Sequence, residues 1–516
     1  MVVFKLRVTG VLGLALFLSA VPGCGGSSDE AGSGTTPSSA GMAKISAFSG
    51  QRLDWKPCAK GQKALCSTVK VPLDYADPGP GNLSIAMYKF PATGKKKGSL
   101  LVNPGGPGGP GLEFAAMMAR SPLSSSYDIV GFDPRGVGAS GQIHCLDDAA
   151  HDAYYAAPTA PTTAEGRNQR RQAAKRLAQA CGEKHLKLLP HVGTENTARD
   201  LEVMRSVLGD RKLNFLGVSY GTLIGQYYAE QYPSRVGRMY LDSVMDPALP
   251  LPKIIEDNAA SSQQTLERFL DNCVTQKSCQ LGGSREQAEQ KVLQMVKALD
   301  ATPVPVASDP RRPVTGSDLR EAVLEGVGSA GEWPQLTQAL VAAVKRDFSG
   351  IRDLADYSHG RGEDGKFSGE DETFLAVACN FASKDDRSHR ALDQAIAEAT
   401  RKSPLFGPLD MFRPCSDWPV ASSVTAHEVT ADTPEPILLA NNSVDPETPL
   451  SWAKAAAEGL EDSTLVTNEG AGHGFLDMGP CTGKVMTDYL INGTVPKAGT
   501  VCKDTGLGKT GETVGK

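Results

Sequence analysis

Short apolar segments that alternate with helical patterns limit the fold of this chain more than any other feature of its sequence. The segments typical of buried strands are residues 68–73, 83–90, 99–103, 127–132, 213–218, 236–241, 436–440 and 463–467. Helical patterns lie among them, for example in residues 195–209, 222–231 and 451–459. Parallel strands need crossover connections, which are usually helices. The sequence therefore predicts an α/β fold with a mostly parallel central sheet flanked by helices.

The pattern changes after the sixth predicted strand. Residues 244–425 show mainly helical signals, as in 285–299 and 319–348, with few strand signals. Strand signals then return in residues 426–503. We therefore expect a sheet core in two parts, residues 50–243 and 426–503, with a large helical lid of residues 244–425 inserted between them, and a polar tail at 504–516.

The N-terminal residues predict export. Lys5 and Arg7 precede an apolar run over residues 8–20, which is too short for a confident membrane span and is typical of a signal peptide. The run ends in Val21-Pro22-Gly23-Cys24, which resembles the lipobox of bacterial lipoproteins. We expect residues 1–23 to be a signal peptide and residues 24–49 a flexible tether with a lipid on Cys24. The protein would then be anchored outside the cytoplasm, or secreted if Cys24 carries no lipid.

The charge of the chain argues against a nucleic-acid partner. The net charge is −6, from 53 basic and 59 acidic residues without a long basic run.

The cysteine count predicts disulfides. Of the eleven cysteines, Cys24 is assigned to the lipid, and the even set that remains predicts disulfides in an exported chain. Sequence does not fix their connectivity, but short loops favour Cys58–Cys66, Cys145–Cys181, Cys273–Cys279, Cys379–Cys415 and Cys481–Cys502. No metal-binding motif occurs, so we expect no metal site and no cofactor.

A candidate nucleophile lies between a predicted strand and a predicted helix, in Gly217-Val218-Ser219-Tyr220-Gly221. Small residues around a serine in this context are typical of a nucleophile elbow. Asp445 and His473 each follow a later predicted strand, so the catalytic candidates occur in the order Ser, Asp, His. His473 would take the proton of Ser219 and later protonate the leaving group, while Asp445 would orient the ring and stabilise the imidazolium.

An oxyanion also needs hydrogen-bond donors placed in advance. The backbone N–H of Tyr220, directly after the nucleophile, is one candidate. The second is expected in the glycine-rich loop 103–108, where prolines lack an N–H, so that Gly106 is the first choice and Gly105 the second.

These motifs together resemble the tripeptidyl-aminopeptidase-like branch of the α/β-hydrolases, which are secreted or lipid-anchored serine exopeptidases of actinobacteria related to proline iminopeptidases. The matching parts are Trp55, Cys58, Cys66, residues 71–75, 103–108, 133–138, 217–222, 241–247, 445–449 and 472–474, Cys481 and Cys502. The resemblance implies the α/β-hydrolase fold, the triad and hydrolysis of peptides from a free N-terminus. This chain departs from the family pattern at Phe381, where an acidic residue is common, and at Ser243, where glycine is usual.

A peptide ammonium would need carboxylates in the lid. The densest acidic cluster there is Glu370-Asp371-Glu372, before a helical run. It is a candidate for substrate binding, although acidic residues at a helix N-terminus are also explained by the helix dipole on a solvated face.

Other functions remain open. Residues 106–111 and 136–141 fit G-x-G-x-x-G, but Pro107 and Pro110 remove amides that a dinucleotide pyrophosphate would need. A carboxylesterase or lipase-like hydrolase of small esters would use the same triad, and a non-catalytic peptide-binding lipoprotein would not use it. The expected partner is therefore a peptide, or else an ester. The sequence indicates no oligomeric state.

Overall fold

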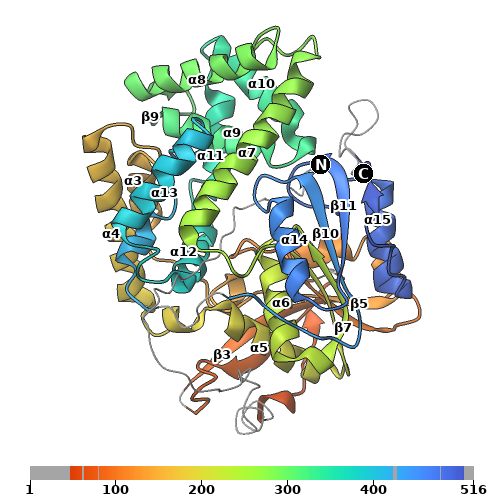
Figure 1. Cartoon of the computed structure of the whole chain (residues 1–516). Helices are drawn as coiled ribbons and strands as arrows, with labels where there is room; N and C mark the ends of the chain where they lie inside the picture. The colour runs from red at the N-terminus through yellow and green to blue at the C-terminus, as the bar shows by residue number, and fades with distance from the viewer. Residues whose placement is uncertain (1–46, 61–62, 80, 422–426, 477, 505–516) are drawn as a thin grey trace, which may run out of the picture.

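The computed structural model describes residues 47–60, 63–79, 81–421, 427–476 and 478–504. Its largest sheet has ten strands in the spatial order β1-β2-β3-β5-β4-β6-β7-β10-β11-β12 (Figure 1). The strands are β1 (Lys56–Pro57), β2 (Leu65–Pro72), β3 (Asn82–Phe90), β4 (Gly98–Asn103), β5 (Tyr127–Phe132), β6 (Leu213–Val218), β7 (Val236–Asp242), β10 (Ile437–Val444), β11 (Thr464–Ala471) and β12 (Val501–Cys502). From β5 through β12 neighbouring strands pair in parallel, whereas β1, β2 and β3 pair antiparallel. The mostly parallel sheet predicted from the sequence is confirmed.

Side chains alternate between the two faces of this sheet, and both faces are buried because helices pack on each of them. Leu101 and Phe215 belong to one core cluster, which also includes side chains from α5 (Thr194–Leu208), α6 (Tyr220–Gln231) and α14 (Leu450–Gly459). Leu100 and Leu216 belong to the opposite cluster, together with side chains from α2 (Gly111–Met118) and α15 (Pro480–Thr487). Each such buried side chain contributes roughly 1.5–3 kcal/mol of transfer free energy. The sheet is thereby a rigid platform for the loops at its ends.

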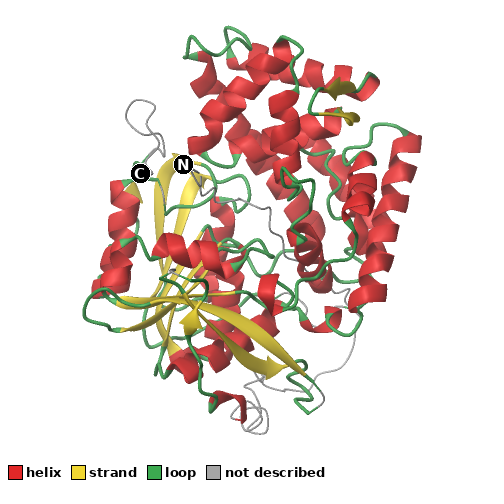
Figure 2. Cartoon of the chain, turned by 180° about the vertical axis from the view of Figure 1, so that it is seen from behind, coloured by secondary structure: helices red, strands yellow, loops and turns green. Residues whose placement is uncertain are grey.

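The lid lies between β7 and β10 and has its own apolar core. The sequence analysis placed the lid after the sixth strand, and β7 is that strand, because the short β1 was not predicted. The lid elements are α7 (Leu251–Val274), α8 (Arg285–Ala301), β8 (Val304–Val306), β9 (Asp309–Val314), α9 (Gly316–Val327), α10 (Trp333–Val344), α11 (Ser349–Ser358), α12 (Glu370–Phe381) and α13 (His389–Lys402). Figure 2 shows these helices gathered beyond one end of the sheet.

Two helices from the first part of the chain pack on this lid. They are α3 (Asp148–Ala156) and α4 (Ala164–His185), which lie beside α13 in Figure 1. Arg170 in α4 is buried and donates hydrogen bonds to the hydroxyl of Tyr154, at 2.9 Å, and to the carbonyl oxygen of Asp410, at 3.0 Å. The sequence analysis assigned residues 50–243 to the core as a whole. Helical periodicity identifies a helix but not the body on which it packs.

The predicted helical stretch 319–348 is interrupted in the structure. Helix α9 ends at Val327, a 3-10 turn covers Ala330–Glu332, and α10 begins at Trp333. Pro334, which has no N–H to donate, is accommodated in the first turn of α10. The interruption exposes the carbonyl oxygen of Gly328, which accepts the backbone N–H of His473 at 2.6 Å. A break in the lid thus contacts the loop that carries the candidate catalytic histidine.

Five disulfides join the ten cysteines of the described part in the pairs favoured above: Cys58–Cys66, Cys145–Cys181, Cys273–Cys279, Cys379–Cys415 and Cys481–Cys502. Across the described ranges, no helix combines the length and apolar character that a membrane crossing needs. The expected signal peptide, Cys24 and nearly all of the expected tether and tail lie outside the described residues.

Candidate active site

Ser219 occupies a strained turn between β6 and α6, with φ +56° and ψ −124°. A positive φ is costly for a serine and persists only where the surrounding structure enforces it. Close packing requires the flanking glycines, since a Cβ on Gly221 would lie 2.8 Å from the carbonyl oxygen of Asn103, and a Cβ on Gly217 would collide with the Gly221 carbonyl. Ser219 is buried, and its Oγ has no hydrogen-bond partner within the described ranges. The turn has the geometry of a nucleophile elbow.

His473 and Asp445 are brought together at the ends of β11 and β10. Nδ1 of His473 lies 2.9 Å and 3.1 Å from the two carboxylate oxygens of Asp445. Asp445 also accepts the backbone N–H groups of Glu447 and Thr448, each at 2.9 Å. These contacts fix the carboxylate and leave Nε2 of His473 as the ring nitrogen that faces away from Asp445. Nε2 has no hydrogen-bond partner in the described part of the chain.

The histidine is held by two carboxylates. Burial alone would lower the pKa of His473, but Asp445 and Glu447 outweigh burial and raise that pKa to about 10. Oε2 of Glu447 lies 3.5 Å from Nε2. Burial raises the pKa of Glu447, while His473 opposes this. Sequence analysis missed Glu447, although its place two residues after Asp445 was a usable signal.

The end of β7 supports the same histidine loop. Asp242 accepts the backbone N–H of Phe475 at 2.8 Å, and burial raises the pKa of this carboxyl to about 7. Ser243 adopts φ +54°, and its Oγ accepts the N–H of Gly474 at 2.9 Å. Ser243 thus stabilises the loop after His473 with a hydrogen bond, although its own backbone is strained.

The glycine-rich loop after β4 lies against the nucleophile turn. A Cβ on Gly105 would be 3.0 Å from both the Cβ of Ser219 and the backbone nitrogen of Tyr220. The N–H of Gly105 donates to Oδ1 of Asn103 at 3.0 Å, so this amide is already used. Tyr220 is the first residue of α6, where a helix leaves N–H groups without intrahelical partners. The N–H groups of Tyr220 and Gly106 thus stay the predicted oxyanion donors, whereas the N–H of Gly105, the second choice, already donates to Asn103.

The acidic residues Glu370, Asp371 and Glu372 form the first turn of α12 but have different surroundings. Glu372 is fully buried and accepts the N–H of Leu146 at 2.7 Å. Asp371 accepts a hydrogen bond from the hydroxyl of Tyr155. The explanation by simple capping on a solvated face does not fit these burials, and Glu372 is turned away from any open surface.

Glu370 lies next to the glycine-rich loop. A Cβ on Gly108 would be 2.8 Å from the carbonyl oxygen of Glu370. Burial, followed by the charges of Asp371 and Glu113, raises the pKa of the Glu370 carboxyl to about 7. No ion pair neutralises this carboxyl within the described residues. The backbone of Glu370 therefore lies against the glycine-rich loop, and its carboxyl, which is close enough to Glu113 of α2 to be affected by that charge, has no cation partner in the described part of the chain.

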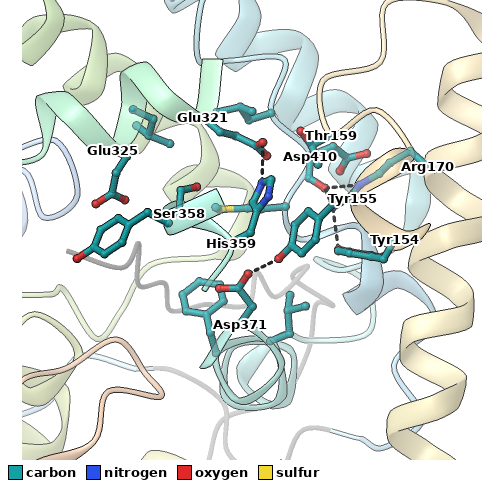
Figure 3. A pocket seen from close by; sticks show the side chains of 16 residues that line it. Tyr154, Tyr155, Thr159, Arg170, Glu321, Glu325, Ser358, His359, Asp371 and Asp410 are labelled. Carbon is teal, nitrogen blue, oxygen red and sulfur yellow. Dashed lines mark hydrogen bonds and ion pairs between the residues drawn. The ribbon is translucent and has the colours of Figure 1, made fainter. Parts of the chain in front are cut away.

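A cavity of about 100 Å³ lies between the lid and helices α3 and α4, and Asp371 of this turn is among its lining residues (Figure 3). Its carboxylates are Glu321, Glu325, Asp371 and Asp410, and its apolar lining includes Leu324, Phe374, Leu375, Leu409 and Met411. Nε2 of His359 contacts Glu321 at 2.8 Å, and the rings of His359 and Tyr155 stack 3.7 Å apart. No local motif marks these residues, and only folding brings them together.

A second cluster surrounds Glu372. Nδ1 of His144 lies 3.3 Å from its Oε2, and Nε2 of His151 lies 3.1 Å from its Oε1. The three ligand atoms all lie within 4.8 Å of one another, a spacing that could hold a metal ion. The sequence analysis expected no metal site because the residues form no continuous motif.

Comparisons with known proteins identify the family of the chain. The family described as alpha/beta hydrolase fold matches residues 98–480. The serine protease Hip1 of Mycobacterium tuberculosis is 33% identical, over 88% of this chain and 91% of the relative. The tripeptidyl aminopeptidase of Streptomyces lividans is 30% identical, over 87% of this chain and 86% of the relative. Carboxylesterase B of M. tuberculosis is 32% identical, over 94% of this chain and 95% of the relative.

Proposed function

The chain belongs to the α/β-hydrolase family and is a serine hydrolase of the peptidase type, and from this premise we propose that it removes short peptides from a free N-terminus. In this reaction Ser219 attacks the scissile carbonyl carbon while Nε2 of His473 takes the hydroxyl proton. His473 then gives that proton to the leaving amine, and Asp445 stabilises the imidazolium. Water enters and hydrolyses the acyl-enzyme by the same proton transfers.

The proposed oxyanion hole consists of the backbone N–H groups of Tyr220 and Gly106. Donors fixed before the reaction cost no reorganisation when charge develops on the carbonyl oxygen. Oγ of Ser219 and Nε2 of His473 both lack hydrogen-bond partners in the described part of the chain, so each is available to the other. Such catalytic hydrogen bonds often form only in the substrate complex.

One observation supports a free N-terminus in particular, namely that Glu370, whose backbone lies against the glycine-rich loop, has a carboxyl group without a cation partner in the described residues. Its pKa is raised by burial and by neighbouring acidic groups because no cation offsets them. A substrate ammonium would supply that charge and would itself avoid the cost of burial without a partner. Among the three acidic residues at the start of α12, we therefore propose Glu370 as the ammonium acceptor, with Asp371 and Glu372 in supporting positions.

The decisive comparison uses three substrates: a peptide amide with a free N-terminus, its N-acetylated form and a neutral short-chain ester. We expect kcat/KM to be highest for the free peptide. Preference for the ester would instead favour a carboxylesterase, a possibility supported by the similarity to carboxylesterase B. Failure of a fluorophosphonate probe to label Ser219 would favour a non-catalytic peptide-binding protein.

We further propose that the enzyme acts outside the cytoplasm, attached to the cell membrane by lipid on Cys24. The charged n-region, the apolar run and the small residues before Cys24 support this proposal. More than one acyl chain on Cys24 would anchor the protein stably to the membrane, whereas a single acyl chain would bind the membrane only marginally.

A further inference from the structure

The surroundings of Glu372 contain more unsatisfied polar atoms than a buried ion pair explains. Oε1 of Glu372 accepts the N–H of Leu146, but Oε2 has no hydrogen-bond partner in the described ranges. Neither ring nitrogen of His151 has one, although the residue is only 3% exposed. Nε2 of His151 is 3.1 Å from Oε1 without the alignment of a hydrogen bond. Buried polar atoms of this kind indicate a missing binding partner.

We propose that His144, His151 and Glu372 bind a divalent transition-metal ion, with Zn²⁺ as the best fit. Two imidazoles and one carboxylate form a ligand set that zinc sites use, with a further position left for water. At ordinary Zn–N and Zn–O bond lengths, neighbouring ligand atoms of a tetrahedral site are about 3.3 Å apart. The separation of 3.3 Å between Nδ1 of His144 and Oε2 of Glu372 matches this spacing, and one ligand atom from each of the three residues lies within 4.8 Å of the others.

The outer contacts of the site are consistent with metal binding. The N–H of Leu146 holds Oε1 of Glu372 and leaves Oε2 facing Nδ1 of His144. The side chain of His144 is 40% exposed, which gives an ion a path from solvent. Ca²⁺ and Mg²⁺ prefer several oxygen ligands, and the cluster supplies oxygen from a single residue, so these ions fit poorly.

The negative charge of the buried Glu372 carboxylate also favours a bound metal ion. Glu372 is fully buried, and a buried carboxylate requires a compensating cation. Histidine supplies a positive charge only when it is protonated, whereas a divalent ion supplies it when both imidazoles are neutral. The ion would fasten the first turn of α12 to the segment that follows β5. The role of this site is structural, because none of its ligands belongs to the proposed triad.

Metal content tests the site independently of any hydrolytic activity. The full chain, purified without a histidine tag, is dialysed with Zn²⁺, then against metal-free buffer, and analysed by elemental mass spectrometry. We expect one equivalent of zinc in the wild type and in His389→Gln, a control that removes a partly exposed histidine from α13. His151→Gln and Glu372→Gln should lower zinc affinity by more than the ~10–100-fold typical of losing an outer-shell partner.

Two further measurements guard against misfolding of the buried variants. His144→Ala changes a partly exposed side chain and should lose zinc while keeping the far-ultraviolet circular dichroism of the wild type. Co²⁺ should give the wild type, but not His144→Ala, the intense visible bands of a tetrahedral nitrogen and oxygen site. Absence of retained zinc and of these bands in the wild type would overturn the proposal, as would equal zinc retention by His144→Ala.

Discussion

Nε2 of His473 lies 3.5 Å from Oε2 of Glu447, while Nδ1 of the same ring contacts Asp445 at 2.9 Å. The imidazole therefore has a carboxylate at each nitrogen. Both carboxylates stabilise the protonated ring, and together they raise the pKa of His473 to about 10 against the opposing effect of burial. A general base must be unprotonated to accept the serine proton, so Glu447 restrains catalysis at pH values below the raised pKa of His473.

Glu447→Gln should therefore move the acid limb of the pH profile of kcat/KM to lower pH. The amide carries no charge that stabilises the imidazolium, so the pKa of His473 falls. Each unit of that fall raises kcat/KM about tenfold at pH values below the limb. Glu458→Gln, on the exposed face of α14, is the control and should leave the limb in place. An unmoved limb in Glu447→Gln would show that this carboxylate does not act on the histidine.

Ser219→Ala and His473→Ala should each lower kcat by as much as ~10⁶-fold, because the triad acts as a unit. The double variant should be no slower than either single variant, which steady-state rates with a peptide amide would show. Multiplying losses would indicate that the two side chains act separately. Unchanged circular dichroism would exclude misfolding as the cause.

Glu370→Gln should raise KM for peptides with a free amine several-fold and leave N-acetylated and ester substrates nearly unchanged. The reason is that the amide cannot neutralise the substrate ammonium. Glu363→Gln, an exposed acidic position before α12, provides the matched control. Equal effects on all substrates would remove Glu370 from substrate recognition.

Cys24→Ser should release the protein from membranes without loss of hydrolysis, because the expected lipid is far in sequence from the site residues. Fractionation of cells followed by an activity assay would show this. Full membrane retention of the variant would contradict lipidation at Cys24.

Replacement of Cys379 and Cys415 by alanine should lower the free energy of unfolding by about 4 kcal/mol on the loop-entropy account. This disulfide spans a sequence separation of 36, whereas Cys58–Cys66 spans 8. Replacement of Cys58 and Cys66 by alanine should therefore lower the free energy of unfolding by a smaller amount. Denaturant titration gives both values. Free thiols at Cys379 and Cys415 in peptide maps of the unreduced protein would contradict the pairing.

Local sequence determined most strands of the sheet and the nucleophile turn. Residues 213–218 are predicted as a strand and form β6, and the glycines around Ser219 allow the close-packed turn before α6, which has no room for a Cβ at those positions. The order of Ser219, Asp445 and His473 at strand ends was also visible, because parallel strands bring their carboxyl ends to one edge of the sheet. These features depend on neighbours in the chain and on a repeating topology.

Tertiary structure alone decided what surrounds those residues. The carbonyl of Gly328 reaches His473 because a predicted helical stretch breaks there, and Glu372 accepts the amide of Leu146 across 226 residues of sequence. The same acidic triplet places Glu370 at the glycine-rich loop and buries Glu372 between two histidines. These contacts form when the lid packs on the core. The periodicity of apolar residues in the sequence predicts whether a segment is a helix or a strand, but it does not predict which segments pack together.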